Sequence, residues 1–183
     1  MRDGGCGLGP YRADLVETYW RWEQHPASLV GYGRQQPESL EARTEGMERQ
    51  LRGDNIRFTV YELTGDADAV PVGVATLLPD TAVRTAEYVV MVAPEARGRG
   101  LGTAATRLVL DYAFHITNVR MVWLKVLAPN RPAVRAYEKA GFRTVGVLRE
   151  AGYWLGRVCD EVVMDALAAE FGGPSTLTPL VAE

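Results

Sequence analysis

The second half of the chain alternates strand-like and helix-like segments, and this alternation is the strongest constraint on the fold. Apolar strand patterns cover 84–92 and 120–128, and a third strand pattern comes near the end of the chain. Helical periodicity covers the segments between them, 101–116 and 131–140. A strand followed by a helix and a second strand of the same sheet requires parallel pairing. At least part of the sheet must therefore be parallel.

The residues before this region predict antiparallel pairing instead. Residues 55–63 alternate apolar and polar side chains, with Ile56, Phe58 and Val60 on one face. A turn-like segment follows, and a second strand pattern covers 70–78. Two strands joined in this way form a hairpin. The predicted fold class is α/β with a mixed sheet.

Two amphipathic helices are expected before the hairpin, at 12–24 and 37–52. The first ends at His25, because a residue before proline avoids the α region. The predicted buried stripe of the second helix is Leu40, Met47 and Leu51. The expected order is two helices, three strands, a helix, a strand, a helix and two strands.

The length of 183 residues suits one domain, which we place at 1–168. Two strands joined across Leu155 and Gly156 close that domain as a hairpin. The remaining segment, 169–183, contains GGPSTLTP and is poor in core-forming side chains. We expect it to be a flexible tail.

Composition excludes several classes of function. The net charge of −3 argues against a nucleic-acid-binding domain, which is usually basic. Cys6 and Cys159 are too few for a disulfide framework, and the sequence contains no metal-binding cluster. The first residues lack the pattern of a signal peptide, and no apolar run reaches the roughly 18 residues of a membrane span. A cytoplasmic location with no membrane partner is expected.

The sequence RGRGLG, Arg97 to Gly102, separates the strand 84–92 from the helix 101–116. The first backbone N–H groups of a helix have no partner within it and carry partial positive charge. Glycine lets a ligand approach the backbone, and arginine adds charge-assisted hydrogen bonds. The segment is therefore predicted to bind phosphate groups.

Two common phosphate motifs fit poorly. A P-loop needs Gly-Lys-Ser/Thr where the chain has Gly100, Leu101 and Gly102. A Rossmann fingerprint is matched formally by Gly100, Gly102 and Ala105. That motif also needs an acidic residue after the next strand, which here ends LKVLAPN. A glycine-rich helix start that binds nothing is the remaining alternative.

A third motif fits better. Arg97, Gly100 and Gly102 match the Arg/Gln-x-x-Gly-x-Gly/Ala loop of the GNAT superfamily of acyl-CoA-dependent N-acyltransferases. The family's second motif, N-x-x-A-x-x-x-Y-E-K-x-G-F, is matched by Asn130, Ala133, Tyr137, Glu138, Lys139, Gly141 and Phe142. The chain resembles this family over about 11–167. Its second half is similar to ribosomal-protein N-terminal acetyltransferases and to antibiotic and small-amine acetyltransferases about equally.

The resemblance implies the GNAT fold, with the family's usual first strand short or missing, and acetyl-CoA as donor. It places the pantetheine arm along the strand 84–92 and the pyrophosphate on the RGRGLG turn. The donor-binding residues it implies are Met91, Val92, Arg97, Gly98, Arg99, Gly100, Leu101, Gly102, Thr103 and Asn130. For Asn130 a role as helix N-cap alone is an equal alternative.

The family also implies that Tyr137 is the general acid. A phenol with a pKa near 10 gives its proton to a thiolate only uphill, by about 2 kcal/mol, which is tolerable if the proton moves as the thiolate forms. The alternative is that Tyr137 is a core aromatic residue on an amphipathic helix.

The general base is less well defined. Glu87 lies in an otherwise apolar strand that resembles family members with a basic glutamate there, and a solvated surface glutamate is the alternative. Lys125 stands where other members carry a glutamate. Glu150, Asp160 and Glu23 are weaker candidates. No metal is expected at the site.

The acceptor site of the family is built from the first helices and the last hairpin. The residues expected to bind substrate are Trp20, Glu23, Tyr32, Tyr153 and Trp154. Many aromatic side chains and few acids suit a flat or apolar amine, or a peptide N-terminus, better than a polyamine.

The expected reaction is acetyl transfer to a primary amine by direct attack in a ternary complex, with a small molecule such as an antibiotic or metabolite as acceptor. The alternatives are a protein N-terminal acetyltransferase and a non-catalytic acyl-CoA sensor, and a homodimer is expected.

Overall fold

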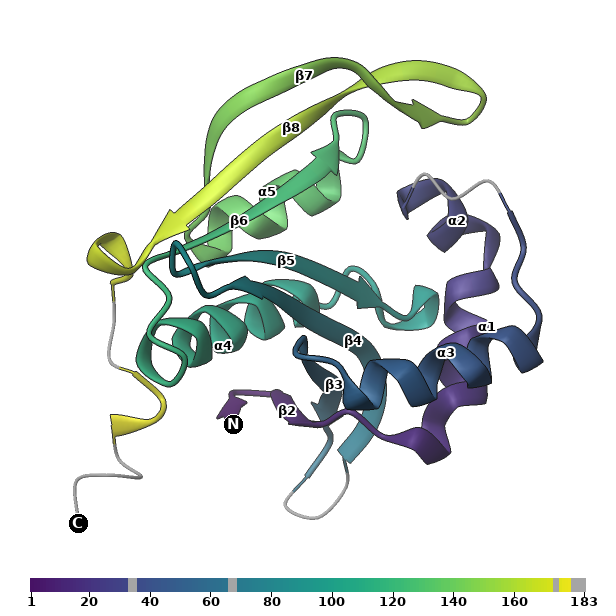
Figure 1. The fold of residues 1–183 in the computed structure, drawn as a ribbon, viewed down its shortest axis with the longest axis horizontal. Coiled ribbons are helices and arrows are strands. Elements are labelled where there is room, and N and C mark those ends of the chain that lie inside the picture. The colour runs from purple at the N-terminus through teal and green to yellow at the C-terminus, as the bar shows by residue number, and fades with distance from the viewer. Residues whose placement is uncertain (33–35, 66–68, 173–174, 179–183) are drawn as a thin grey trace.

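The computed structural model describes residues 1–32, 36–65, 69–172 and 175–178. Its strands are β1 (Arg2–Asp3), β2 (Cys6–Pro10), β3 (Ile56–Leu63), β4 (Ala69–Asp80), β5 (Thr85–Val92), β6 (Met121–Leu127), β7 (Arg143–Trp154) and β8 (Arg157–Leu167). Its α-helices are α1 (Val16–Gln24), α2 (Pro26–Tyr32), α3 (Leu40–Arg52), α4 (Leu101–His115) and α5 (Arg131–Ala140). The described strands form one sheet in the order β1-β2-β3-β4-β5-β6-β8-β7 (Figure 1).

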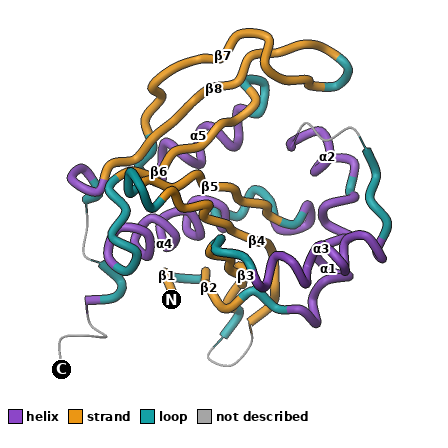
Figure 2. Tube along the Cα trace, viewed as in Figure 1, coloured by secondary structure: helices purple, strands orange, loops and turns teal. Residues whose placement is uncertain are grey.

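The sheet is mixed, which confirms the predicted fold class. Among the described strands, β5 and β6 are the one parallel pair, and every other neighbouring pair is antiparallel. The parallel pairing runs only from Thr85 to Glu87 on β5 and from Met121 to Trp123 on β6. Beyond these residues the two strands separate, as Figure 2 shows.

The N-terminal region differs from the expected order. The first strand of the main sheet is short but present: β2 pairs with β3 over five residues and buries Cys6 and Leu8. Its sequence, CGLGP, carries no strand pattern, because glycine and proline disfavour strands. Pairing with β3 therefore decides its conformation.

A second difference lies after α1. His25 has an extended backbone, as expected before proline, and α1 ends at Gln24. Pro26 then begins another helix, α2, in a segment where no helix was predicted. Proline suits the first turn of a helix, because its missing N–H would have no partner there.

Helices cover both faces of the sheet. The ring of Phe58 on β3 meets Tyr112 of α4 at 5.0 Å between centroids. The next residue, Thr59, points to the opposite face, where its hydroxyl hydrogen-bonds Tyr19 of α1. One face of the sheet therefore packs on α4, and the other is covered by α1 and by α3 beside it (Figure 1).

Part of the expected tail contacts α4. Phe171 packs against Phe114, and the carboxylate of Asp111 accepts hydrogen bonds from Ser175 and Thr176. Residues 173–174 and 179–183 of the expected tail lie outside the described residues. None of the helices that the structure describes is long and apolar enough to cross a membrane.

Replacing Asp111 by alanine should destabilise the fold by about 1–3 kcal/mol, because Ser175 and Thr176 lose a buried acceptor. Burial raises the pKa of Asp111, but the hydrogen bonds from Ser175, Thr176 and His115 outweigh it and hold the pKa below its usual value. This stabilisation is therefore present above about pH 4 and is lost as the pH falls further.

Urea unfolding from pH 7 to pH 2 measures both effects, with exposed Asp54→Ala as the control. An Asp111→Ala protein with the stability and acid sensitivity of the wild type would contradict this role.

Candidate active site

The edge of β5 facing β6 is free beyond Glu87. Ala93 donates its N–H to Val72 of β4, and alternate residues of an antiparallel strand face the same neighbour. The backbone of Met91 is therefore paired with β4, contrary to the expectation that it faces the donor. Val90 and Val92 face the gap, so Val92 has the expected orientation and Val90 takes the place assigned to Met91.

Side chains from other elements bind the two carbonyls in this gap. The Tyr32 hydroxyl of α2 donates to the carbonyl of Val90, and Arg97 Nε donates to that of Val92 at 3.1 Å. The N–H groups of Val90 and Val92 face the same gap. A ligand lying along this edge would meet a strand with exposed backbone donors.

The RGRGLG turn begins where this edge ends. Gly98 and Gly100 have φ angles of 77° and 82°, which are strained for residues other than glycine. Gly100 is the N-cap of α4, and no side chain caps the helix. The N–H groups of Leu101, Gly102 and Thr103 precede the first helical bond, from Ala104 to Gly100, and so point out of the helix start. These amides fit a pyrophosphate group.

Both arginines of the turn already have protein partners. Arg97 Nη2 donates to Ser28 Oγ at 2.8 Å, so Arg97 ties α2 to the turn. Arg99 pairs with Glu62 at 2.8 Å and is half exposed. Among the described residues, Arg97 thus has partners for all three of its nitrogens, whereas Arg99 binds Glu62 through Nη1 alone and keeps Nε and Nη2 beside the backbone amides.

Two other expected donor residues have structural roles. Asn130 caps α5 by accepting from the N–H of Ala133, as predicted for an N-cap. The hydroxyl of Thr103 donates to the carbonyl of Ala136 at 3.4 Å and so connects α4 with α5. The side chain of Leu101 is buried, so the group that it presents at the start of α4 is its backbone N–H.

Tyr137 lies on α5 against the free part of β5. Its ring is 6.4 Å from that of Tyr88 and 5.9 Å from that of Phe142, both edge to face. Within the described parts of the chain, no group hydrogen-bonds its hydroxyl. Burial raises the pKa of Tyr137 to about 12, so the phenol keeps its proton at neutral pH.

Glu87 is the last residue of β5 that pairs with β6, opposite Trp123. The side chains of Glu87, Val89 and Met91 point to one face of β5, because they alternate along the strand. Glu87 thus stands where the two strands separate.

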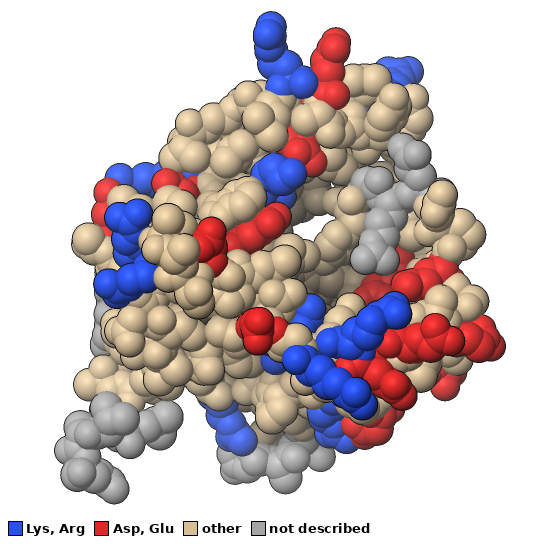
Figure 3. Space-filling view, viewed as in Figure 1, with Lys and Arg blue, Asp and Glu red and all other residues tan. Residues whose placement is uncertain are grey.

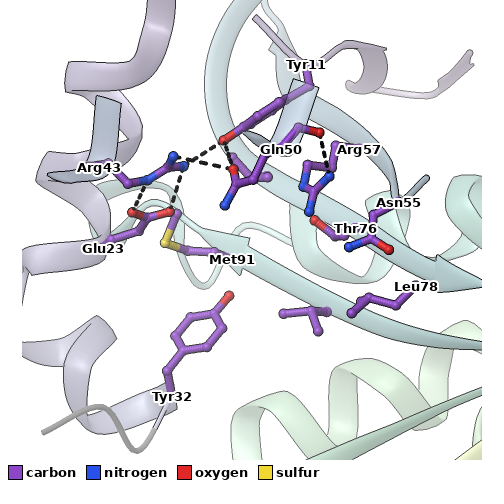
Figure 4. A pocket seen from close by; sticks show the side chains of 12 residues that line it. Tyr11, Glu23, Tyr32, Arg43, Gln50, Asn55, Arg57, Thr76, Leu78 and Met91 are labelled. Atoms are coloured by element: carbon purple, nitrogen blue, oxygen red, sulfur yellow. Dashed lines mark hydrogen bonds and ion pairs between the residues drawn. The ribbon is translucent and has the colours of Figure 1, made fainter. Parts of the chain in front are cut away.

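A cavity of about 270 Å³ adjoins this row of β5 side chains. Its lining residues are Tyr11, Glu23, Tyr32, Arg43, Gln50, Asn55, Arg57, Val74, Thr76, Leu78, Val89 and Met91. Figure 4 shows Tyr32 opposite the polar cluster of Tyr11, Gln50 and Arg57. Figure 3 shows the surface hollowed between the β7–β8 hairpin and the body of the molecule.

A buried ion pair forms one wall of the cavity. Arg43 Nε donates to one carboxylate oxygen of Glu23 at 2.7 Å, and Nη2 donates to the other at 3.2 Å. Nη2 also donates to the Tyr11 hydroxyl at 2.6 Å. Burial alone would lower the pKa of Arg43, but these partners raise it above its usual value.

Two of the five expected acceptor residues line this cavity, Glu23 and Tyr32. Trp20 instead donates its indole N–H to the carbonyl of Glu38 at 2.7 Å. Tyr153 and Trp154 lie at the end of the β7–β8 hairpin, outside the lining set.

The arginines of the cavity were not predicted from the sequence. The expected stripe of α3 included Leu51, which is 49% exposed, whereas Arg43 is 4% exposed. Arg43 follows Leu40 by three positions, so helical spacing places it on the buried face of α3. It was not predicted there because a charged side chain is rarely buried. Arg57 alternates with Ile56 and Phe58, which places it on the face opposite α4.

Comparison with known proteins gives the family. The family model for the acetyltransferase (GNAT) family matches residues 14–142. The chain belongs to the GNAT family. It is an acyl-CoA-dependent N-acetyltransferase, and the fold and donor predicted from the sequence are confirmed.

Named relatives of this acetyltransferase include polyamine enzymes. Spermidine N(1)-acetyltransferase of Vibrio cholerae is 30% identical over 146 residues, covering 79% of this chain and 83% of the relative. The enzyme of the same name from Escherichia coli is 30% identical over 124 residues, covering 67% of this chain and 64% of the relative. The crystal structure of the Vibrio cholerae enzyme with CoA and spermine has a TM-score of 0.83 at 23% identity, covering 92% of this chain and 99% of that one.

Gly100→Ala should weaken CoA binding about tenfold, because a side chain opposes the left-handed backbone that aims the free amides. Isothermal titration with CoA measures the effect. Gly46→Ala in α3 is the matched control, since its added methyl meets nothing within 4 Å and its dissociation constant should not change. Equal CoA affinities for the two variants would exclude the turn as the pyrophosphate site.

Proposed function

We propose that this acetyltransferase moves an acetyl group from acetyl-CoA to a primary amine of a small molecule, by direct attack within a ternary complex. The observation that carries the proposal is the free edge of β5, which leads from Glu87 past the cavity to the uncapped start of α4. Bound acetyl-CoA supplies the thioester: the amine nitrogen forms a bond to the carbonyl carbon, the C–S bond breaks, the amine loses one proton and the sulfur gains one.

The donor would lie along this edge. The N–H groups of Val90 and Val92 would hold the pantetheine arm, and those of Leu101, Gly102 and Thr103 would hold the pyrophosphate. Gly98, Arg99 and Asn130 remain the further donor-binding residues that the family resemblance implies.

Tyr137 would protonate the departing sulfur. Its hydroxyl stays protonated at neutral pH and faces no competing protein acceptor among the described residues. The raised pKa makes transfer to a fully formed thiolate uphill by about 5 kcal/mol, more than a free phenol requires. The proton must therefore move while the C–S bond breaks.

Glu87 would accept the proton that the amine releases, directly or through water. Its place where β5 and β6 separate puts Glu87 beside the end of the donor path. Glu23, the weaker candidate, has both carboxylate oxygens bound to Arg43.

The proposal is tested by thiol release from acetyl-CoA with a panel of small primary amines, including spermidine, and of short peptides with free N-termini. Acetyl transfer to small amines supports it. Turnover confined to peptides would favour an N-terminal acetyltransferase, and CoA binding without turnover would favour a sensor.

Tyr137→Phe should lower kcat about a hundredfold or more and leave CoA affinity unchanged, because only the proton donor is lost. Steady-state kinetics and titration with CoA measure the two effects. Tyr112→Phe on α4, whose ring packs on Phe58, is the control. Unchanged kcat in Tyr137→Phe would assign Tyr137 to packing alone.

Glu87→Gln should lower kcat/KM about a hundredfold near neutral pH, with a smaller loss at higher pH where more of the acceptor amine is already neutral. A pH profile of kcat/KM measures this, with exposed Glu48→Gln on α3 as the control. If kcat/KM is unchanged, or falls by the same factor at every pH, Glu87 is not the general base.

A further inference from the structure

Among the residues that the structure describes, the charged side chains that line the cavity are two arginines and one glutamate: Arg43, Arg57 and Glu23. The lining therefore carries an excess of one positive charge. Such a lining would repel a polycationic acceptor. A charge in a partly buried site needs an opposite charge beside it, and like charges placed together cost free energy.

Glu23 offers no free negative charge. Both of its carboxylate oxygens accept hydrogen bonds from Arg43, and Arg43 is buried. The two charges therefore compensate each other, and the excess positive charge of the cavity lies on Arg57.

Arg57 has no acidic partner in the described part of the chain. Its one hydrogen bond to a protein atom there runs from Nη1 to the backbone carbonyl of Gln50, at 3.0 Å. A guanidinium carries further N–H donors, which this bond leaves available. Burial lowers the pKa of Arg57 below its usual value; Tyr11 acts against this shift, and the nearby charge of Arg43 acts with it. An anion bound here would pair a half-buried charge that now lacks a counter-ion.

The neighbours of Arg57 suit an oxyanion. Thr76 lies beside Arg57 in the β3–β4 register and supplies a hydroxyl, and Asn55 supplies an amide to the same wall (Figure 4). Arginine binds carboxylates in a fork of two N–H donors, and the hydroxyl and amide add further donors.

We propose that the acceptor is an amine that also carries a carboxylate, and that Arg57 binds this carboxylate. The inference rests on the proposed function and adds the chemical class of the acceptor. Arg57 on β3, Thr76 on β4 and Val89 on β5 lie in one row across the sheet. Two strand spacings, about 10 Å, separate β3 from β5, so the carboxylate end lies away from the donor and the amine points toward β5.

The test compares each carboxylate with its neutral amide, which has nearly the same shape. The pairs are L-lysine and L-lysinamide, β-alanine and β-alaninamide, and L-phenylalanine and L-phenylalaninamide, with spermidine as the polycation. We expect kcat/KM from thiol release to favour the carboxylate of at least one pair by about tenfold or more, and to exceed that for spermidine. Amides or spermidine used as well as the best carboxylate would overturn the inference.

Variants locate the preference. Arg57→Gln should raise KM for the preferred carboxylate about ten- to a hundredfold and leave KM for its amide nearly unchanged. Arg57→Lys should retain part of the preference, because it keeps the charge but lacks the fork. Exposed Arg52→Gln removes the same charge outside the cavity and should behave as the wild type. Thermal melting checks that each variant folds. If a variant does not fold, the comparison of carboxylates with amides in the wild-type protein decides the inference.

A binding measurement separates this inference from the proposed function. If no amine in the panel gives thiol although CoA binds, the proposed function fails. Isothermal titration of the same pairs into the CoA-bound protein then still tests Arg57. Tighter binding of carboxylates, lost in Arg57→Gln, supports the inference, and equal binding of carboxylates and amides overturns it.

Discussion

The separation of β5 from β6 after Glu87 is the constraint on which the site depends. A parallel pair consumes the backbone groups along both facing edges, so continued pairing would leave no edge for a ligand. Because pairing stops, Val90 and Val92 face a gap that ends at the glycine turn before α4. Tyr32 and Arg97 bind carbonyls in that gap and so attach α2 to it. The free edge of β5 and the place of Glu87 at its start thus share one structural origin, the end of the parallel pairing.

The buried pair of Glu23 and Arg43 has a different role. Burying two charges is costly unless each is fully paired, and here the bidentate contact and the Tyr11 hydroxyl meet that condition. The pair joins α1 to α3 over the sheet and removes the charge of Glu23 from the cavity. Among the charges of the cavity lining, the cavity is left with that of Arg57, on which the proposed binding of a carboxylate rests.

The apolar packing that positions Tyr137 also sets its chemistry. Contacts with Tyr88 and Phe142 hold the ring against β5, and the same burial raises the pKa of the phenol. The group is a reliable proton carrier at neutral pH but a weaker acid than a phenol in water. Under the proposed mechanism, proton transfer from Tyr137 is therefore coupled to the breaking of the C–S bond, where the sulfur is gaining negative charge.

Local patterns in the sequence determined the mixed sheet, the helices α4 and α5, the N-cap at Asn130 and the glycine turn. Each of these depends on residues close together in the chain, so periodicity and turn chemistry sufficed. Tertiary structure alone decided β2, α2, the backbone direction of Met91 and the cavity arginines. These depend on strand register and on contacts between distant segments, such as Arg43 with Glu23 and Tyr11, and such pairings leave no local pattern. A buried arginine looks like a surface residue in a sequence, because only the fold brings its counter-charge to it.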